Sequence, residues 1–229
     1  MVKKVIVLSL GGSLIVPNEV NIKYLKKFKE VIEKHKRKYK FIIVCGGGNV
    51  ARKYITALAS IGAPTKFQGF SGISATRMNA RFISYFFGQD QERGMPHTIA
   101  ELKKYVKKYD LVFCGGLEYR TKQTSDSTAA EIAQNMKAEF VNLTNVDGLY
   151  DKNPSKFKNA KFIPEISWSA FDKMANKLKF HPGQHFVLDQ TASGMIKKSK
   201  TTTYIIGEDI KQLEALLNNK KFKGTKIQG

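Results

Sequence analysis

Hydrophobic residues recur with two different periods along this chain. Short runs that are apolar at nearly every position predict strands covered on both faces, at residues 5–10, 41–45, 111–114 and 140–143. Elsewhere, apolar residues recur every three or four positions, as on one face of an amphipathic helix. The pattern predicts helices at residues 21–32, 50–61, 71–87, 99–107, 128–136, 168–178, 188–198 and 209–217, with a further strand at 202–206.

Strands that alternate with helices indicate an α/β protein. We therefore predict a three-layer α/β/α sandwich with a mainly parallel central sheet. The polar segment 151–161 is expected to be a loop or hairpin, and His181-Pro182-Gly183 a break. No internal repeat or low-complexity linker divides the chain, so residues 1–229 are expected to form a single compact domain with two lobes.

The net charge is +20, from 39 basic and 19 acidic residues, and only six of the basic residues are arginine. The lysines are spread along predicted helices rather than interleaved with aromatic residues, so we interpret them as a solvated surface. Nucleic-acid binding is the alternative interpretation, and we do not favour it. Under either interpretation, the positive field attracts anionic substrates such as nucleotides.

The remaining composition favours a cytoplasmic protein. No apolar run approaches the roughly 20 residues that cross a bilayer, and residues 1–4 lead into a strand without a signal-peptide pattern. Cys45 and Cys114, the only cysteines, end apolar strands and are expected to behave as small hydrophobic residues. Neither a disulfide framework nor metal-ligand spacing is present in the sequence.

Three of the predicted strands run directly into glycines. The turns are Gly11-Gly12-Ser13, Gly46-Gly47-Gly48 and Gly115-Gly116. A strand that ends at glycine and leads into a helix exposes backbone N–H groups at the helix start, where phosphate binds readily. Three such turns indicate a surface that holds more than one phosphate.

Two common nucleotide-binding patterns do not fit these turns. Gly46-x-Gly48-x-x-Ala51 matches the loose dinucleotide pattern, but no acidic residue for the ribose lies between Glu33 and Asp90. This counts against an NAD enzyme. A P-loop is excluded because Gly-Lys-Ser/Thr occurs nowhere in the chain.

Polar and basic residues accompany the turns. Arg52 follows the second turn, on the first turn of a helix, and can reach back toward a phosphate; an exposed helical arginine is the alternative. Arg77 and Arg81 are interpreted as ordinary surface cations. The segment 124–127 supplies hydroxyls and an acid that can cap a helix or hold a phosphate, and 142–150 can form a turn or the rim of a base site.

In order and spacing, these segments resemble the amino acid kinase superfamily. Ser-Leu-Gly-Gly-Ser is followed by Gly-Gly-Gly-x-x-Ala-Arg-Lys-Tyr, then by Thr-Ser-Asp-x-x-Ala after the third glycine turn, and then by Thr-Asn-Val-Asp-Gly-Leu-Tyr. Within the superfamily the chain is most similar to the archaeal branch of uridylate (UMP) kinases. The resemblance runs nearly end to end and includes residues 187–189 and 224–227.

The resemblance implies an ATP-dependent kinase that converts UMP to UDP in pyrimidine nucleotide synthesis. It implies catalytic roles for Arg52, beside the transferring phosphate, and for Asp126, an organising acid. Residues implied to bind ATP are Gly11, Gly12, Ser13, Gly48, Arg52, Thr144, Asn145, Tyr150 and Asn153. Residues implied to bind UMP are Gly47, Gly69, Thr124 and Ser125. Mg²⁺ is expected to be held by the nucleotide phosphates and water, without a metal site made by the protein.

The resemblance also implies an arrangement of lobes and subunits. Residues 1–140 would form the acceptor lobe and residues 141–229 the nucleotide lobe. A homohexamer built from dimers is expected, and the aromatic-rich segment 82–87 is either an interface stripe or part of the core.

The chain departs from the family pattern at several positions. Ser9 stands where many members have a lysine, Gly69 where related kinases have an aspartate on the uridine ribose, and Asn153 where an aspartate is typical. The segment 117–123 is about two residues longer than in those kinases. Two of these departures concern the acceptor, so acetylglutamate-like or carbamate-like kinases stay open, as does a non-catalytic regulatory protein that binds nucleotides.

Overall fold

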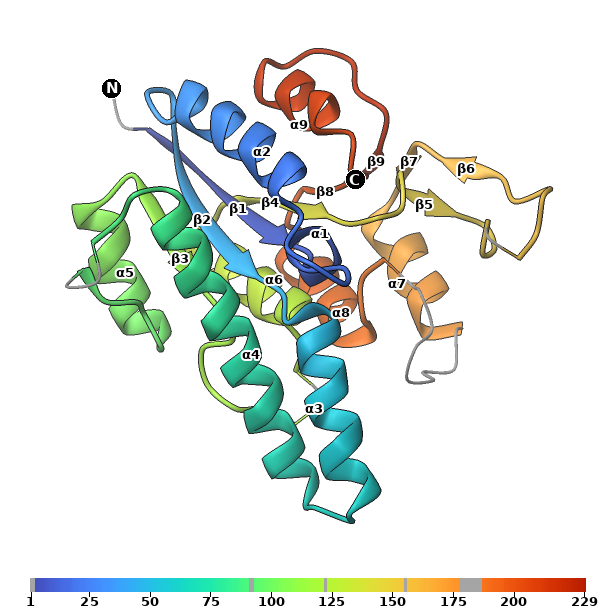
Figure 1. Cartoon of the computed structure of the whole chain (residues 1–229). Coiled ribbons are helices and arrows are strands. Elements are labelled where there is room, and N and C mark those ends of the chain that lie inside the picture. The colour runs from blue at the N-terminus through green and yellow to red at the C-terminus, as the bar shows by residue number, and fades with distance from the viewer. Residues whose placement is uncertain (1–2, 91–92, 122, 155, 178–186) are drawn as a thin grey trace.

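The central layer is a seven-stranded sheet, seen in the computed structural model (Figure 1), which describes residues 3–90, 93–121, 123–154, 156–177 and 187–229. The strand order is β3-β2-β1-β4-β8-β9-β7. The strands are β1 (Lys4–Leu10), β2 (Tyr39–Cys45), β3 (Leu111–Cys114), β4 (Glu139–Leu143), β7 (Glu165–Ile166), β8 (Thr203–Ile206) and β9 (Thr225–Ile227). A separate hairpin pairs β5 (Leu149–Tyr150) with β6 (Phe162–Ile163).

The first five strands of this order are all parallel. Ile6 of β1 pairs with Phe41 of β2 and with Glu139 of β4, and the same direction continues to β3 and β8. Only β9 runs antiparallel to its neighbour β8. The predicted mainly parallel sheet is therefore confirmed, and the carboxyl ends of β3, β2, β1, β4 and β8 lie along one edge.

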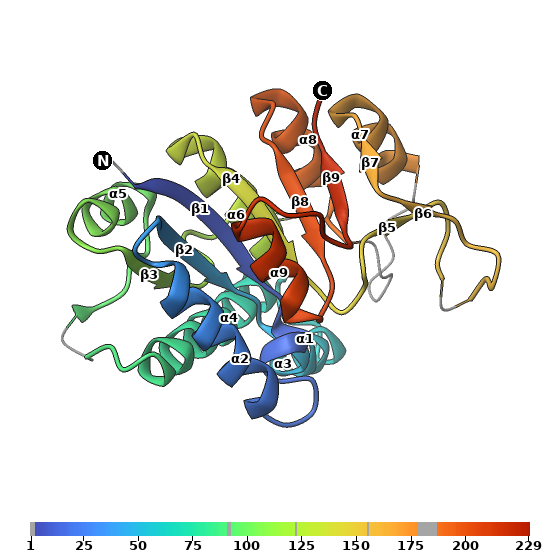
Figure 2. The ribbon, with the colours of Figure 1, turned by 90° about the horizontal axis from the view of Figure 1, so that it is seen from above.

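Helices cover both faces of the sheet, as Figure 2 shows. They are α1 (Gly12–Ile15), α2 (Ile22–His35), α3 (Gly48–Ser60), α4 (Thr65–Phe86), α5 (Ile99–Lys108), α6 (Ser125–Met136), α7 (Trp168–Lys177), α8 (Gln190–Ser199) and α9 (Ile210–Leu217). Alternation along β1 sends Leu8 into the core under α1, α2 and α9, and Val7 into the core under α5, α6 and α8. The three-layer prediction is confirmed.

Several of the predicted helices begin at or beside their capping residues. Asn21 caps α2 by accepting a hydrogen bond from the Tyr24 amide, and Asp209 caps α9 in the same way. The prediction that a helix begins at residue 71 was wrong, because α4 begins at Thr65. The helix predicted at 128 begins at Ser125. The predicted break at residues 181–183 lies outside the described residues.

The segment Phe82–Phe87, for which two roles were open, lies mainly against the core. Ile83 is fully buried, Phe87 belongs to the same buried cluster, and Phe82 and Phe86 pack against it. Tyr85 alone among its aromatic residues is exposed. Among the described helices, none is long and apolar enough to cross a membrane.

Candidate active site

The first two glycine turns are in direct backbone contact. A Cβ atom on Gly12 would lie 2.0 Å from the Gly48 nitrogen, and one on Gly46 would lie 2.6 Å from the Gly12 nitrogen. Gly48 also has φ +60°, in the left-handed region. Any side chain at these positions would separate the turns. We call Gly11, Gly12, Gly46, Gly47 and Gly48 the glycine junction.

The glycine junction can attract an anion. Helix α3 begins at Gly48, and its N-cap residue Gly47 has no side chain that could hydrogen-bond to the first N–H groups. The first turn of α3 contains no acidic residue. The partial positive charge of this helix start is therefore not neutralised by the helix itself, which favours phosphate there.

The third glycine turn is attached to α4 rather than to the other two turns. A Cβ atom on Gly115 would lie 2.5 Å from the Arg77 nitrogen, and the Gly116 amide donates a 2.8 Å hydrogen bond to the Thr76 hydroxyl. Arg77 donates to the carbonyls of Gly116, at 2.9 Å, and of Leu117. Arg77 was predicted to be an ordinary surface cation, and this was wrong because its guanidinium holds the third turn in place.

Helix α6 begins beside the third turn with a complete cap. The Thr124 hydroxyl oxygen accepts hydrogen bonds from the amides of Asp126, at 3.1 Å, and Ser127, at 3.2 Å, while the Ser127 hydroxyl accepts one from the Thr124 amide. Thr124 also donates to Asp189 Oδ2 at 2.5 Å. Asp189 in turn caps α8. The amino-terminal ends of two helices thus meet at Thr124 and Asp189.

The surroundings of Asp126 disfavour the ionised form of its carboxyl group. Its Oδ1 accepts a 2.8 Å hydrogen bond from the fully buried hydroxyl of Ser9, the residue at which the resemblance led us to expect a lysine. Burial, with a smaller contribution from the Asp189 carboxylate, raises the pKa of Asp126 to about 7, and the Ser9 hydrogen bond opposes this change. A lysine would have stabilised the ionised form, whereas a neutral hydroxyl does so only weakly.

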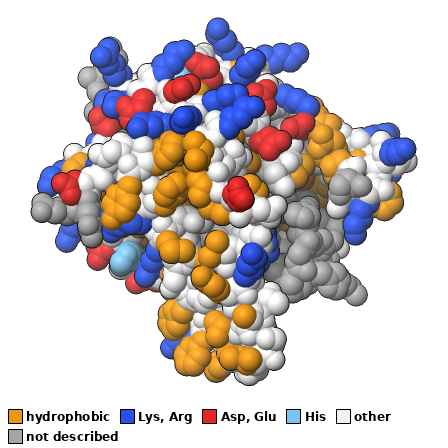
Figure 3. All heavy atoms as spheres, viewed as in Figure 1, with side chains coloured by type: hydrophobic (Ala, Val, Ile, Leu, Met, Phe, Trp, Pro, Cys, Tyr) orange, Lys and Arg blue, Asp and Glu red, His pale blue; other side chains and the backbone are white. Residues whose placement is uncertain are grey.

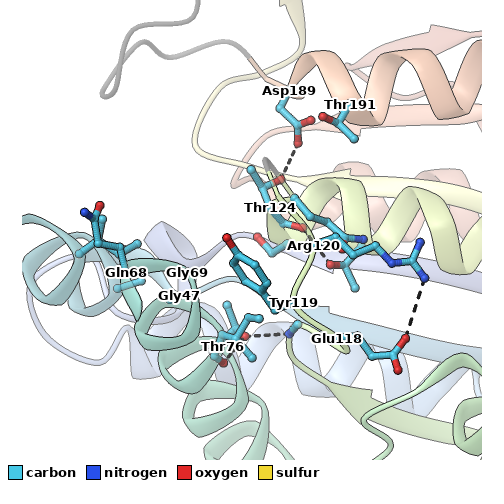
Figure 4. Close-up of a pocket in the computed structure, with 18 of the residues that line it drawn as sticks. Gly47, Gln68, Gly69, Thr76, Glu118, Tyr119, Arg120, Thr124, Asp189 and Thr191 are labelled. Carbon is cyan, nitrogen blue, oxygen red and sulfur yellow. Dashed lines mark hydrogen bonds and ion pairs between the residues drawn. The ribbon is translucent and has the colours of Figure 1, made fainter. Parts of the chain in front are cut away.

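All four residues predicted to bind the acceptor line one cavity. Gly47, Gly69, Thr124 and Ser125 contribute to its wall, and its volume is about 570 Å³. The cavity lies between α3, α4, the segment after β3 and the starts of α6 and α8 (Figure 4). Its size is within the range of about 300–1,000 Å³ that is usual for small-molecule sites.

A second cavity, also of about 570 Å³, lies beside the β5–β6 hairpin. Tyr150 and Asn153, two of the residues predicted to bind ATP, line it together with Val146, Phe157 and Met174. The Tyr150 ring is supported edge-on by Phe162 at a centroid distance of 5.4 Å. An aromatic wall of this kind suits a planar base.

The strand order places the glycine junction between the two cavities. The first cavity adjoins the carboxyl ends of β3 and β2, the junction is at the ends of β2 and β1, and the second cavity follows β4. Thr144 and Asn145 also follow β4, but neither lines either cavity. Phosphates reaching the junction from both sides would meet there.

Two further residues predicted to bind ATP, Arg52 and Ser13, do not line either cavity. Arg52 is exposed on α3, lines neither cavity, and has no ion-pair partner among the described residues. Ser13 is partly buried in α1. Within the described ranges, no group of three or more His, Cys, Asp or Glu side chains is placed to hold a metal ion.

Sequence reasoning assigned no role to Tyr119, Thr76 or Asp189, although all three line the first cavity. The position of Asp189 directly before a helix was the available signal. For Thr76 no local signal exists, because its partner Gly116 is 40 residues away in the chain.

A parallel sheet with glycine turns and two flanking cavities at its carboxyl edge defines an α/β protein built to bind phosphorylated ligands. The chain belongs to the amino acid kinase family, whose family model matches residues 4–207.

Within the amino acid kinase family, the similar proteins are uridylate kinases. A uridylate kinase from Methanobrevibacter smithii is 31% identical over 224 residues, which cover 97% of this chain and 98% of that protein. A uridylate kinase from Thermococcus sibiricus is also 31% identical, with 97% and 99% coverage. The crystal structure of uridylate kinase from Archaeoglobus fulgidus superimposes with a TM-score of 0.84 at 31% identity, covering 97% of this chain and 99% of that one.

Proposed function

We propose that this chain transfers the γ-phosphate of ATP to UMP and so produces UDP and ADP. The observation that carries the proposal is the position of the glycine junction between two cavities, one lined by the predicted acceptor residues and one by Tyr150 and Asn153. Near full-length similarity to archaeal uridylate kinases supports UMP as the acceptor.

In this proposal an oxygen of the UMP phosphate attacks the γ-phosphorus of ATP. The bond between the γ-phosphorus and the β,γ-bridging oxygen breaks, and ADP leaves with the electron pair. Such transfer depends on alignment and charge neutralisation more than on covalent catalysis. The N–H groups at the start of α3 and the Arg52 guanidinium supply positive charge, and Mg²⁺ held by the phosphates of ATP would neutralise further negative charge.

A panel of acceptors with Mg²⁺ and ATP tests the proposal. UMP should be phosphorylated faster than CMP, AMP or N-acetylglutamate, measured by direct separation of the products. Formation of no UDP would refute the proposal. Phosphorylation of N-acetylglutamate in preference to UMP would favour the carboxylate-kinase alternative.

Arg52→Ala tests the position assigned to the transferring phosphate. We expect kcat to fall by at least roughly 100-fold, as for other groups that stabilise transition-state charge. Lys53→Ala is the matched control, because Lys53 is the next residue of α3, is also exposed, and loses the same charge. Equal rates for the two variants would place the transferring phosphate elsewhere.

We also infer that the chain forms a homo-oligomer, a hexamer by its resemblance to the family. Exposed apolar side chains on α3 and α4, whose linked ends project at the bottom of Figure 3, support the inference; they are Tyr54, Phe67, Phe70, Met78 and Tyr85. Light scattering coupled to size exclusion would test it, and a monomer at micromolar concentration would contradict it.

A further inference from the structure

Gly69 lies inside α4, where glycine destabilises a helix relative to alanine. The structure contains a reason for it. A Cβ atom at this position would lie 2.3 Å from Cε2 and 2.8 Å from Cδ2 of Tyr119, which is closer than nonbonded carbon atoms approach. The absence of a side chain at residue 69 therefore makes room for the Tyr119 ring.

The residues before and after Tyr119 are both anchored to neighbouring helices. Before it, Leu117 is buried and its carbonyl accepts a hydrogen bond from Arg77. After it, Arg120 forms a 2.8 Å ion pair with Glu131 of α6. The segment that the sequence comparison found to be longer than expected is thus attached to α4 and α6. These attachments fix the position of the Tyr119 ring.

That place is the wall of the acceptor cavity. Figure 4 shows the Tyr119 ring between Gly69 on one side and Arg120 and Thr124 on the other. Its Cδ2–Cε2 edge meets α4, and the Phe70 ring supports it at a centroid distance of 5.2 Å. The cavity keeps about 570 Å³ with the ring in place, so the ring forms a wall and does not fill the site. No described residue hydrogen-bonds to the Tyr119 hydroxyl.

We propose that Tyr119 is a specificity-determining residue that stacks on the nucleobase of the acceptor, and that Gly69 is required to seat its ring. The inference rests on the proposed function. A supported aromatic ring in a cavity bordered by polar groups suits a planar heterocycle, whose face stacks and whose edge hydrogen-bonds. An acceptor without a base gains nothing from this wall.

The direct test compares the binding of UMP and of ribose 5-phosphate, which lacks the base, by calorimetry. Tyr119→Ala should weaken UMP binding by about 5- to 150-fold, the usual effect of losing one stacking partner. Ribose 5-phosphate should bind Tyr119→Ala and wild type equally, and Tyr119→Phe should keep UMP affinity. Unchanged UMP affinity in Tyr119→Ala, or an equal loss for both ligands, would overturn the inference.

A double-mutant cycle tests the role of Gly69. Gly69→Ala should weaken UMP binding in wild type, because the methyl group displaces the ring, and should have no further effect in Tyr119→Ala. Gly194→Ala is the matched control, since Gly194 also lies within a helix and a Cβ atom there meets nothing within 4 Å. Equal additional losses in both backgrounds would contradict the pairing.

The two proposals fail differently. A wild-type protein that phosphorylates UMP while Tyr119→Ala binds it unchanged would overturn the stacking role alone. A wild-type protein that neither binds nor phosphorylates UMP would overturn both.

Discussion

Replacing Asp126 by Asn should make the protein more stable at neutral and alkaline pH. The pKa of Asp126 is about 7 in the folded protein and 3.8 in the reference state. The folded state therefore binds this proton more tightly than the unfolded state does. The resulting stability is fully present below the unfolded pKa and is lost as the pH rises through 7.

The magnitude follows from the two pKa values. A change from 3.8 to about 7 corresponds to roughly 4 kcal/mol, at about 1.4 kcal/mol for each pH unit. Because part of Asp126 remains in contact with water, we expect about half of this, roughly 2 kcal/mol, between about pH 4 and pH 7. Asparagine keeps the shape and can still accept the Ser9 hydrogen bond, but it does not ionise.

Urea unfolding followed by the fluorescence of Trp168, the only tryptophan, measures this effect at several pH values. The free energy of unfolding of wild type should fall from about pH 4 to pH 7, and that of Asp126→Asn should stay nearly level. Asp172→Asn is the control, because hydrogen bonds from Lys197 and Ser193 lower the pKa of Asp172, so its effect lies at acidic pH. Parallel curves for wild type and Asp126→Asn would refute the reasoning.

The same substitution should reduce phosphoryl transfer. If Asp126 organises the site as proposed, Asp126→Asn gains stability at pH 8 and loses most of its activity, and Asp126→Ala also loses most of its activity while it still folds. Residues that act in an active site often lower the stability of the folded protein. Full activity in Asp126→Asn would remove Asp126 from the catalytic residues.

Three further substitutions test the framework of the site. Gly48→Ala should lower the free energy of unfolding by about 1–3 kcal/mol, because Gly48 has a positive φ and its Cβ would meet the backbone of Gly12. Gly194→Ala, measured in the same chemical unfolding experiment, should not lower it. Arg77→Lys should raise the KM for UMP and lower stability by about 1–2 kcal/mol, since one ammonium group cannot replace both guanidinium contacts; an unchanged KM would contradict this. Thr124→Val should cost about 1 kcal/mol through loss of the α6 cap, and Thr124→Ser should restore it.

The fold was largely predictable because its signals are local. Strands buried on both faces are apolar at nearly every position, so β1, β2 and β3 were located within two residues of their ends. The glycine turns were also local signals, and they correctly marked the edge of the sheet where the cavities lie. Which turns touch could not be read from the sequence, because β1 and β2 come together only in the sheet.

Glycines within α4 show why the remaining features were not predictable. Glycine disfavours a helix locally, and α4 contains Gly69 and Gly72. The predicted helix began at residue 71, after Gly69, whereas α4 begins at Thr65. The structure explains both by close approach: a Cβ atom on Gly72 would lie 3.1 Å from Ile55 of α3, and one on Gly69 would overlap Tyr119.

The contact between Gly69 and Tyr119 also connects two unusual features of the chain. The glycine at residue 69 and the longer segment 117–123 are separate departures in the sequence, but in space each accommodates the other. If the pair had arisen through loss of function, the enlarged segment would be free to lie anywhere on the surface. Instead Leu117 is buried, Arg120 is paired with Glu131, and the ring between them faces the acceptor cavity. The departures are therefore better explained as a rebuilt wall of the proposed acceptor site than as its decay.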